Sequence, residues 1–286
     1  MLFLSGALSQ WAGPYLYDRQ IWFEDRSGIL DPDIDLNGVD ILMVTALINE
    51  APRAYQIARL AKLYHPEIIT IGGGPQMSPL PEEAIELGGF DVIVNREGED
   101  IIGQLSDTLL EYKDSPMLDS YLEKIPGISF MRDGALVQTR RSGLVAPDFV
   151  ELPDFRSIKD LTPSYPMAGG VLETVRGCTE SCTYCQVIQQ FLGYRLIDRE
   201  TENKRLLQLQ ELASDGLIHV SGNGRFTVFI SDDLHTPPLR AVKYRNERLE
   251  RLKSWKGRTD DMYMICLLYT SPSPRDLSTS RMPSSA

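Results

Sequence analysis

The chain has 286 residues, of which 42% are hydrophobic and 24% charged, and its formal net charge is −11. This composition is typical of a globular protein with room for two domains. The negative charge argues against a nucleic-acid-binding surface, because phosphate contacts need clustered lysine and arginine. No apolar run approaches the about 20 residues of a membrane span. The N-terminal residues contain no basic leader, so we expect a cytoplasmic protein, where thiols stay reduced.

The first part of the chain is predicted to alternate between strands and helices. Near-continuous apolar runs of the kind found in buried parallel strands occupy residues 39–46, 67–71 and 91–94. Helical periodicity is found between them and after them, over residues 52–64, 81–87 and 99–112. This order predicts an α/β domain with right-handed βαβ units and a doubly wound parallel sheet. Residues 1–30 are irregular, apart from a candidate strand at 21–23.

A glycine-rich turn, residues 72–75, directly follows the second predicted strand. Ligands of doubly wound sheets bind beyond the carboxyl ends of the strands, and the missing side chains of glycine let a bulky ligand approach the backbone. Taken alone, the same pattern is explained equally well by an ordinary structural turn.

Residues 113–165 are predicted to connect two domains. Prolines interrupt this stretch repeatedly, and residues 127–138 have the pattern of a hairpin that turns at Asp133 and Gly134. We assign no chemistry to this connector.

Three of the four cysteines lie close together, at Cys178, Cys182 and Cys185. Three thiolates can hold three irons of a [4Fe–4S] cube and leave the fourth iron open to another ligand. A disulfide would leave one thiol over, and a zinc site would need a fourth ligand from a position remote in sequence. The remote candidates are His219, His235 and Cys266.

The region around the cysteines is predicted to contain the first units of a βα barrel. Strands are expected at residues 169–174, 225–230 and 262–265, with helices at 200–215 and 239–255. Barrel enzymes place their chemistry at the carboxyl ends of strands, where Ser231, Asp232 and Asp233 follow the second strand. The alternative is that these residues only cap the next turn. Arg176 could pair with a carboxylate of the site or form a surface salt bridge, and the role of Glu173 is open.

These motifs together resemble the cobalamin-binding branch of the radical S-adenosylmethionine (SAM) proteins. The resemblance rests on the cysteine spacing with Tyr184 before the last cysteine, on the glycine turn, and on the Arg-Glu-Gly-Glu turn at residues 96–99. It implies that Cys178, Cys182 and Cys185 hold a [4Fe–4S] cluster. It also implies a SAM site that includes Tyr184, Ser231, Asp232 and Asp233. Cobalamin would lie near Thr45, Gly72, Gly73, Gly74, Pro75, Glu97, Gly98 and Glu99.

The sequence departs from the family pattern in two places. Arg96 stands where the family's second turn begins with glycine, and the Asp-x-His-xx-Gly motif that supplies a lower histidine ligand in other cobalamin domains is absent. Bound cobalamin would therefore lack a histidine ligand, and His65 is interpreted as a surface residue.

The resemblance implies an enzyme that cleaves SAM reductively to a 5′-deoxyadenosyl radical. With cobalamin present it implies methyl transfer to, or a related radical modification of, a small-molecule substrate, with electrons from an external flavodoxin-type or ferredoxin-type donor. One alternative is a radical SAM enzyme whose N-terminal domain does not bind cobalamin. Another is a non-catalytic zinc or Fe–S module.

Four regions are expected along the chain. Residues 1–115 form a cobalamin-binding-like domain, 116–165 a linker, 166–265 a partial radical SAM barrel and 266–286 a tail. The tail is rich in serine and proline without helical periodicity, which is typical of disorder, and it resembles translated adapter read-through. The family's first strand and later barrel strands have no counterpart here, so we expect an incomplete and inactive fragment of an enzyme.

Overall fold

The computed structural model describes residues 1–140, 143–183 and 185–266, which form two compact units. The first unit contains Met1–Leu161 and Cys182–Leu192, and the second contains Thr162–Ser181 and the chain from Gly193 onward. Within the described residues, no helix combines the length and apolar character needed to cross a bilayer.

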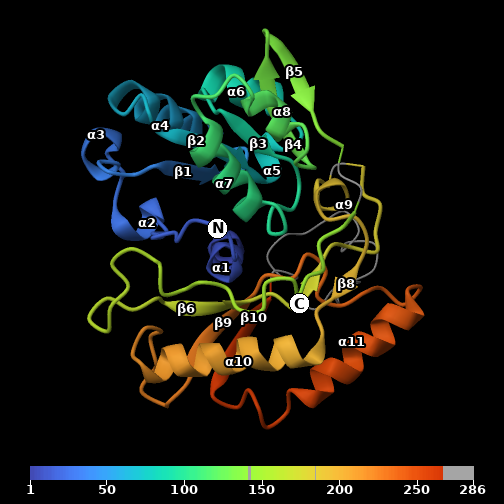
Figure 1. Cartoon of the computed structure of the whole chain (residues 1–286). Helices are drawn as coiled ribbons and strands as arrows, with labels where there is room; N and C mark the ends of the chain where they lie inside the picture. Colours follow the sequence, from blue (N-terminus) through green and yellow to red (C-terminus); the bar gives the residue numbers. More distant parts are fainter. Residues whose placement is uncertain (141–142, 184, 267–286) are drawn as a thin grey trace, which may run out of the picture. The chain divides into compact units, whose positions relative to one another are not determined.

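The first unit is built on a five-stranded sheet with the strand order β1-β2-β3-β4-β5 (Figure 1). The parallel strands are β1 (Ile41–Thr45), β2 (Ile69–Gly73) and β3 (Val92–Val94). They are joined through the helices α4 (Ala51–Tyr64), α5 (Gly74–Met77) and α6 (Pro81–Gly88). The predicted strands and helices of this region are therefore confirmed, with small shifts at their ends.

Side chains alternate between the two faces of this sheet and form a core on each. On one face, Ile71 and Val92 pack in a cluster with residues of α1 (Leu2–Gln10) and α7 (Ile102–Tyr112). On the other face, Ile93 packs in a cluster with residues of α4 and α6. Helices cover both faces, as the prediction of a doubly wound α/β fold requires.

The predicted hairpin extends this sheet instead of serving as a linker. Strands β4 (Ile128–Arg132) and β5 (Ala135–Gln138) are antiparallel, and β4 pairs with β3. The prediction that residues 116–165 lie outside the first domain is corrected for the hairpin. The physical reason is that β3 is buried along its whole length and needs a partner on its second side.

The N-terminal residues contain a helix that the sequence did not predict. Helix α1 has apolar residues without a clear polar face, and its Ala7 and Leu8 are buried against the sheet. After it, the Trp11 indole N–H donates to Asp107 in α7 at 2.7 Å. The remaining short helices of this unit are α2 (Glu24–Ser27), α3 (Pro32–Asp35), α8 (Leu118–Leu122) and α9 (Val187–Gln190).

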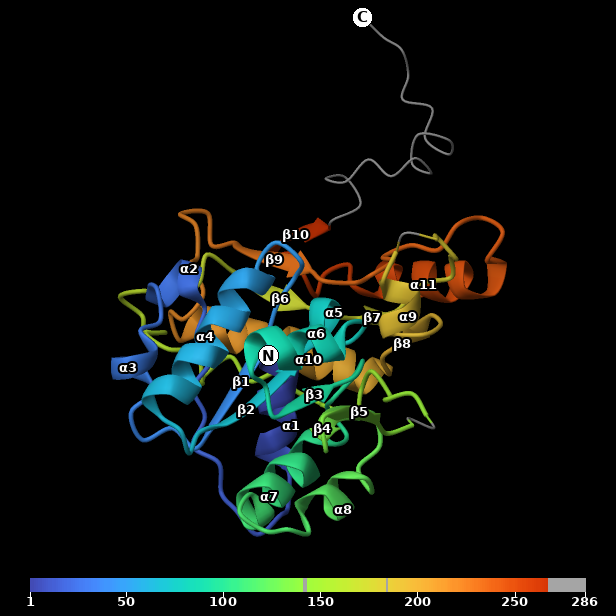
Figure 2. The ribbon, with the colours of Figure 1, turned by 90° about the horizontal axis from the view of Figure 1, so that it is seen from above.

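The second unit contains a parallel sheet with the order β10-β9-β6. Its strands are β6 (Gly169–Leu172), β9 (Phe226–Ile230) and β10 (Met262–Cys266), connected through α10 (Arg199–Ser214) and α11 (Val242–Ser254). Helix α10 packs on this sheet so closely that a Cβ on Gly170 would lie 2.6 Å from Leu209 (Figure 2). The predicted order of strands and helices is confirmed.

A short pair of antiparallel strands lies at the two ends of the cysteine-containing segment. Strand β7 (Val175–Arg176) pairs with β8 (Arg195–Leu196) in the second unit. The chain between these strands carries the three clustered cysteines and α9.

Candidate functional site

The carboxyl ends of the first unit's parallel strands form a continuous edge. The strand register places Thr45, Gly73 and Val94 side by side across β1, β2 and β3. Gly74 follows with φ +86°, and a Cβ added there would lie 2.1 Å from Oγ1 of Thr45. The glycine turn therefore brings three predicted cobalamin-binding residues, Thr45, Gly73 and Gly74, into contact at the expected edge.

This edge has the composition expected of a surface for a large, flat ligand. Gly73 contributes only partly exposed backbone, Pro75 is also partly exposed, and Thr45 is exposed. In the loop after β1, Leu47 and Ile48 are 52% and 78% exposed. Partly exposed backbone groups beside exposed apolar side chains suit a bulky ligand with an extended face.

Gly72 has a packing role instead. A Cβ at Gly72 would lie 2.6 Å from Cδ1 of Ile93 and 2.8 Å from Sδ of Met77, so a larger residue would disturb the core beneath the edge. The glycines of the turn thus serve different purposes, and sequence alone could not separate them.

The second predicted cobalamin turn, residues 96–99, follows β3 at the same edge. The N–H of Arg96 donates to Oγ of Ser78 at 3.0 Å, and that hydroxyl donates to the carbonyl of Val94 at 3.3 Å. Glu97 is only 3% exposed, and Gly98 lies so close to Val94 that a Cβ would be 2.8 Å from its Cγ1. The turn is consequently packed against the end of β3.

Arg96 departs from the family pattern at a position where glycine is physically favoured. Its φ is +67°, in the left-handed region that side chains with a Cβ disfavour. Its carbonyl oxygen accepts a hydrogen bond from Nε2 of Gln190, at the end of α9, at 2.9 Å. Sequence reasoning did not identify Gln190, which is buried although it is polar.

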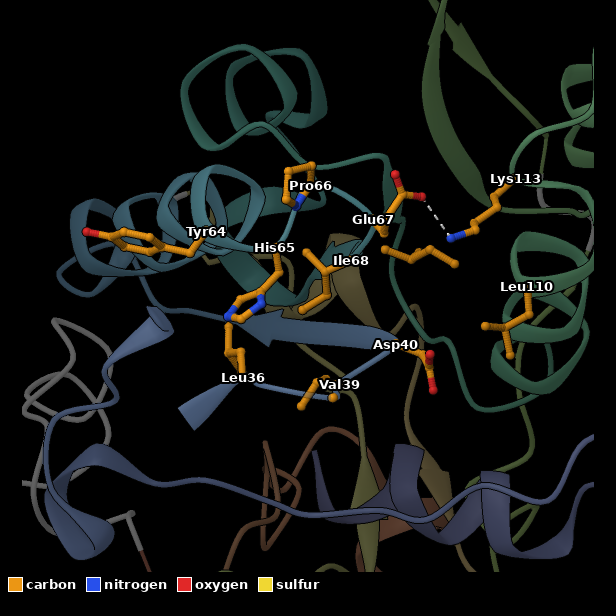
Figure 3. Close-up of a pocket in the computed structure, with 12 residues that line it drawn as sticks. Leu36, Val39, Asp40, Tyr64, His65, Pro66, Glu67, Ile68, Leu110 and Lys113 are labelled. Carbon is orange, nitrogen blue, oxygen red and sulfur yellow. Dashed lines mark hydrogen bonds and ion pairs between the residues drawn. The ribbon is translucent and has the colours of Figure 1, made fainter. Parts of the chain in front are cut away.

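His65 lies at the opposite edge of the sheet. It ends α4, and its Nε2 is 2.9 Å from the carbonyl oxygen of Pro32. It lines a cavity of about 360 Å³ near the amino ends of β1 and β2 (Figure 3). Of the chain's three histidines, only His65 belongs to the first unit, so within that unit no imidazole reaches the carboxyl-end edge.

The three clustered cysteines are half-buried, and they are divided between the two units. Cys178 belongs to the second unit, where its Sγ accepts a hydrogen bond from the N–H of Glu180 at 3.4 Å. Cys182 and Cys185 belong to the first, where the N–H of Cys185 donates to the carbonyl of Cys182 at 3.1 Å. Among the residues described, no three His, Cys, Asp or Glu side chains are grouped as metal ligands. The cluster ligand set stays a prediction, and Tyr184 lies outside the described residues.

Glu173 and Arg176, whose roles the sequence left open, form a buried ion pair in the second unit. The Arg176 guanidinium donates to both carboxylate oxygens of Glu173, at 3.0 and 2.9 Å, and its side chain is 3% exposed. Arg205 from α10 donates to the carbonyl of Glu173 at 2.9 Å. The pair is not on the surface, and it braces the chain just before Cys178.

Three of the four residues predicted to bind SAM follow β9, but they have different environments. The N–H of Ser231 donates to the carbonyl of Leu172, and Asp232 is buried. Asp233 is exposed as a residue, and its Oδ2 accepts from the N–H of Gly177 at 2.7 Å. Desolvation by the surrounding protein, reinforced by the charge of Glu173, raises the pKa of Asp233 to about 6. A contact with SAM stays a prediction for these residues.

Comparison with known proteins finds a family match for the part of the chain that contains the carboxyl-end edge. Residues 29–106 match the family model of the B12 binding domain. The resemblance to cobalamin-binding radical SAM proteins is confirmed. The chain is 28% identical over 181 residues to the cobalamin-dependent radical SAM methyltransferase TokK of Streptomyces tokunonensis, covering 57% of this chain and 23% of TokK.

Two further proteins are similar over larger shares of their length. The uncharacterized methyltransferase PH0819 of Pyrococcus horikoshii is 29% identical over 159 residues, covering 53% of this chain and 32% of that protein. The radical SAM methyltransferase TsrM of Kitasatospora setae, solved with cobalamin and a [4Fe–4S] cluster bound, has the same fold with a TM-score of 0.54. Sequence identity with TsrM is 14%, and the similarity covers 81% of this chain and 44% of TsrM. The chain thus spans less than half of each of these relatives.

Proposed function

We propose that this chain is part of a cobalamin-dependent radical SAM methyltransferase acting on a small molecule. The observation that carries the proposal is that one chain contains both a B12-binding domain match over residues 29–106 and the three clustered cysteines. A bound [4Fe–4S] cluster would supply the electron that cleaves SAM, and bound cobalamin would carry the methyl group.

In this proposal the first unit holds cobalamin at its carboxyl-end edge. Gly73 adds no side chain at the strand ends, and Gly74 lets the chain turn close against Thr45. Thr45 and the exposed Leu47 would flank the ring. The buried Glu97 and the tightly packed Gly98 fix the turn after β3, so this edge is rigid before a ligand arrives.

The residues of the second unit prepare the chain that leads into the cysteines. The Glu173–Arg176 pair is buried, and Arg205 also lies 3.6 Å from the Glu173 carboxylate, so removing Glu173 would take away a carboxylate that faces two buried arginines. The Asp233 carboxylate accepts a hydrogen bond from the N–H of Gly177, the residue before Cys178, and so holds the backbone at that point. Thiolates of Cys178, Cys182 and Cys185 would hold the cluster, and electrons would come from an external flavodoxin-type or ferredoxin-type donor.

Anaerobic reconstitution of the full chain with ferrous iron and sulfide tests the cluster. We expect iron bound per chain and a visible charge-transfer spectrum that changes when SAM is added. A C178A/C182A/C185A variant should bind no iron, whereas C266A, which removes the fourth cysteine, should match the unchanged chain. Tightly bound zinc without iron would contradict the proposal and favour a zinc module.

Titration with hydroxocobalamin, followed by its visible spectrum, tests the corrin site separately. We expect saturable binding without the spectral signature of a coordinated histidine. Iron binding and a SAM response without cobalamin binding would favour a radical SAM protein whose first unit has another role.

A further inference from the structure

Asp232 is buried at the end of β9 and accepts hydrogen bonds from the chain that leads into the cysteine segment. Its Oδ1 accepts from the backbone N–H groups of Thr174 at 2.6 Å and Val175 at 2.8 Å. Its Oδ2 accepts from Oγ1 of Thr174 at 2.8 Å. Thr174 is fully buried, so these bonds exclude water. The side chain of Asp232 therefore fixes the backbone between β6 and β7.

The negative charge of Asp232 is compensated by a buried arginine from α11. The side chains of Asp232 and Arg248 are both 0% exposed, and Nη2 of Arg248 lies 2.8 Å from Oδ2. Nδ1 of His235 lies 3.1 Å from the same oxygen. Arg248 also donates to the carbonyl of His235 at 2.9 Å, and its guanidinium lies 5.3 Å from the ring centre of Trp255. Removing this carboxylate would leave a buried cation unpaired, which explains why the group is fully enclosed.

The acceptor capacity of Asp232 is filled by these partners. A carboxylate offers about four lone-pair positions, and five polar groups of the second unit already surround the two oxygens. Asp233, whose Oδ2 accepts a hydrogen bond from the N–H of Gly177, is the less enclosed of the two residues. The two neighbouring aspartates thus differ in what they can still bind.

We propose that Asp232 is a positioning residue for the cysteine segment and does not contact SAM. It holds residues 174 and 175 at the ends of β6 and β9, so the chain reaches Cys178 from a fixed point. This inference rests on the proposed function, because a fixed approach matters for assembling an iron–sulfur cluster. Arg248 and His235 act through Asp232 by holding its carboxylate in place.

The test compares Asp232→Asn with Asp198→Asn in the full chain. An asparagine at 232 keeps one acceptor oxygen and turns an NH2 group toward either the backbone N–H groups or Arg248. Asp198 is a matched control, since it accepts from the N–H groups of Glu200 and Thr201 and from the Thr201 hydroxyl, but at the start of α10. Two quantities are measured: iron bound per folded chain after anaerobic reconstitution, and amide hydrogen exchange at residues 174, 175 and 177.

We expect Asp232→Asn to bind several-fold less iron per folded chain and to exchange the amides of Thr174 and Val175 about tenfold faster. Asp198→Asn should retain the iron content and the exchange rates of the unchanged chain at these positions. Unchanged iron content and unchanged exchange in Asp232→Asn would overturn the inference, as would rapid exchange at these amides in the unchanged chain.

Failure of the proposed function gives a different result. If the unchanged chain binds no iron while Asp232→Asn still accelerates exchange, the cluster proposal falls, and with it the role of Asp232 toward a cluster, although the backbone contact stands. If Asp232→Asn does not fold, Thr174→Val, which removes the hydroxyl bond alone, is compared with Thr174→Ser, which keeps it. Equal iron content and exchange in that pair would overturn the inference.

Discussion

Gln190 donates a hydrogen bond from its side-chain amide to the carbonyl oxygen of Arg96 at 2.9 Å. Gln190 is the last residue of α9, five residues beyond Cys185, and the bond joins it to the turn that is predicted to contact cobalamin. Both groups belong to the first unit, so the end of the cysteine segment is attached to the carboxyl-end edge by a specific contact.

Replacing Gln190 with alanine should loosen this attachment. A buried hydrogen bond contributes about 1 kcal/mol, so amide exchange in α9 should be several-fold faster. Gln189→Ala is the matched control, because Gln189 is exposed on the same helix. Equal exchange rates in the two variants would show that the bond does not hold α9.

Replacing Arg96 with glycine should stabilise the first unit. The left-handed conformation of Arg96 costs about 1 kcal/mol for a residue with a Cβ, and glycine adopts it freely. Part of this gain is offset by the greater entropy of glycine in the unfolded chain, so the free energy of unfolding should rise by up to about 1 kcal/mol. Arg59→Gly, on the exposed side of α4, should lower it by about 1 kcal/mol. Denaturant unfolding measures both, and a loss of stability in R96G would contradict this account.

Replacing Gly74 with alanine should destabilise the carboxyl-end edge and weaken hydroxocobalamin binding. The added Cβ would collide with Oγ1 of Thr45, and forced overpacking of this kind costs about 1–3 kcal/mol. Gly89→Ala is the control, because Gly89 also has a positive φ, +72°, but its Cβ would make only an ordinary contact at 3.7 Å. Adding Thr45→Ala to G74A should restore most of the free energy of unfolding that G74A loses relative to G89A. If the effects of G74A and Thr45→Ala on this free energy were strictly additive, the collision would be excluded.

The Asp233 carboxyl predicts a specific pH dependence. Its pKa in the folded chain is about 6, above its ordinary value of 3.8, so the folded state binds this proton more tightly. The protonated carboxyl therefore adds to the free energy of unfolding. This contribution is complete below the ordinary pKa of 3.8 and is lost as the pH rises through about 6. Asp233→Asn, which does not ionise, should therefore gain stability relative to the unchanged chain as the pH rises from about 4 to about 6, and the gain should stay constant at higher pH. Unfolding curves across this range measure the gain, and a difference that does not vary with pH would refute the prediction.

Much of the fold could be predicted because local patterns determine it. The strands β1 to β3 have continuous apolar runs, and Asp133 and Gly134 adopt the positive φ values that their hairpin turn requires. Helix α1 could not be predicted, because its apolar residues follow no helical period and are ordered by packing on the sheet. The pairing of β4 with β3 is a long-range contact that no local pattern contains.

The candidate site could be predicted only in part. The glycine turn is predicted to lie at the carboxyl end of β2, and it does, because its backbone conformation requires glycine at Gly74. The cysteine ligands stay a prediction. The buried arginines could not be predicted from sequence. Arg205 and Arg248 lie in helices rich in charged residues, and their burial depends on tertiary packing. The different environments of Asp232 and Asp233, neighbours in the chain, likewise became visible only in the fold.

The hairpin after α8 also protects the first unit from association with other chains. Without β4, the wholly apolar strand β3 would present its free N–H and C=O groups as a template for strand addition, a common route to aggregation. With the hairpin in place, the outermost strand on that side is β5, which is short and has exposed residues at both ends. Expression trials that shorten this chain should therefore keep residues 128–138 to obtain monomeric protein.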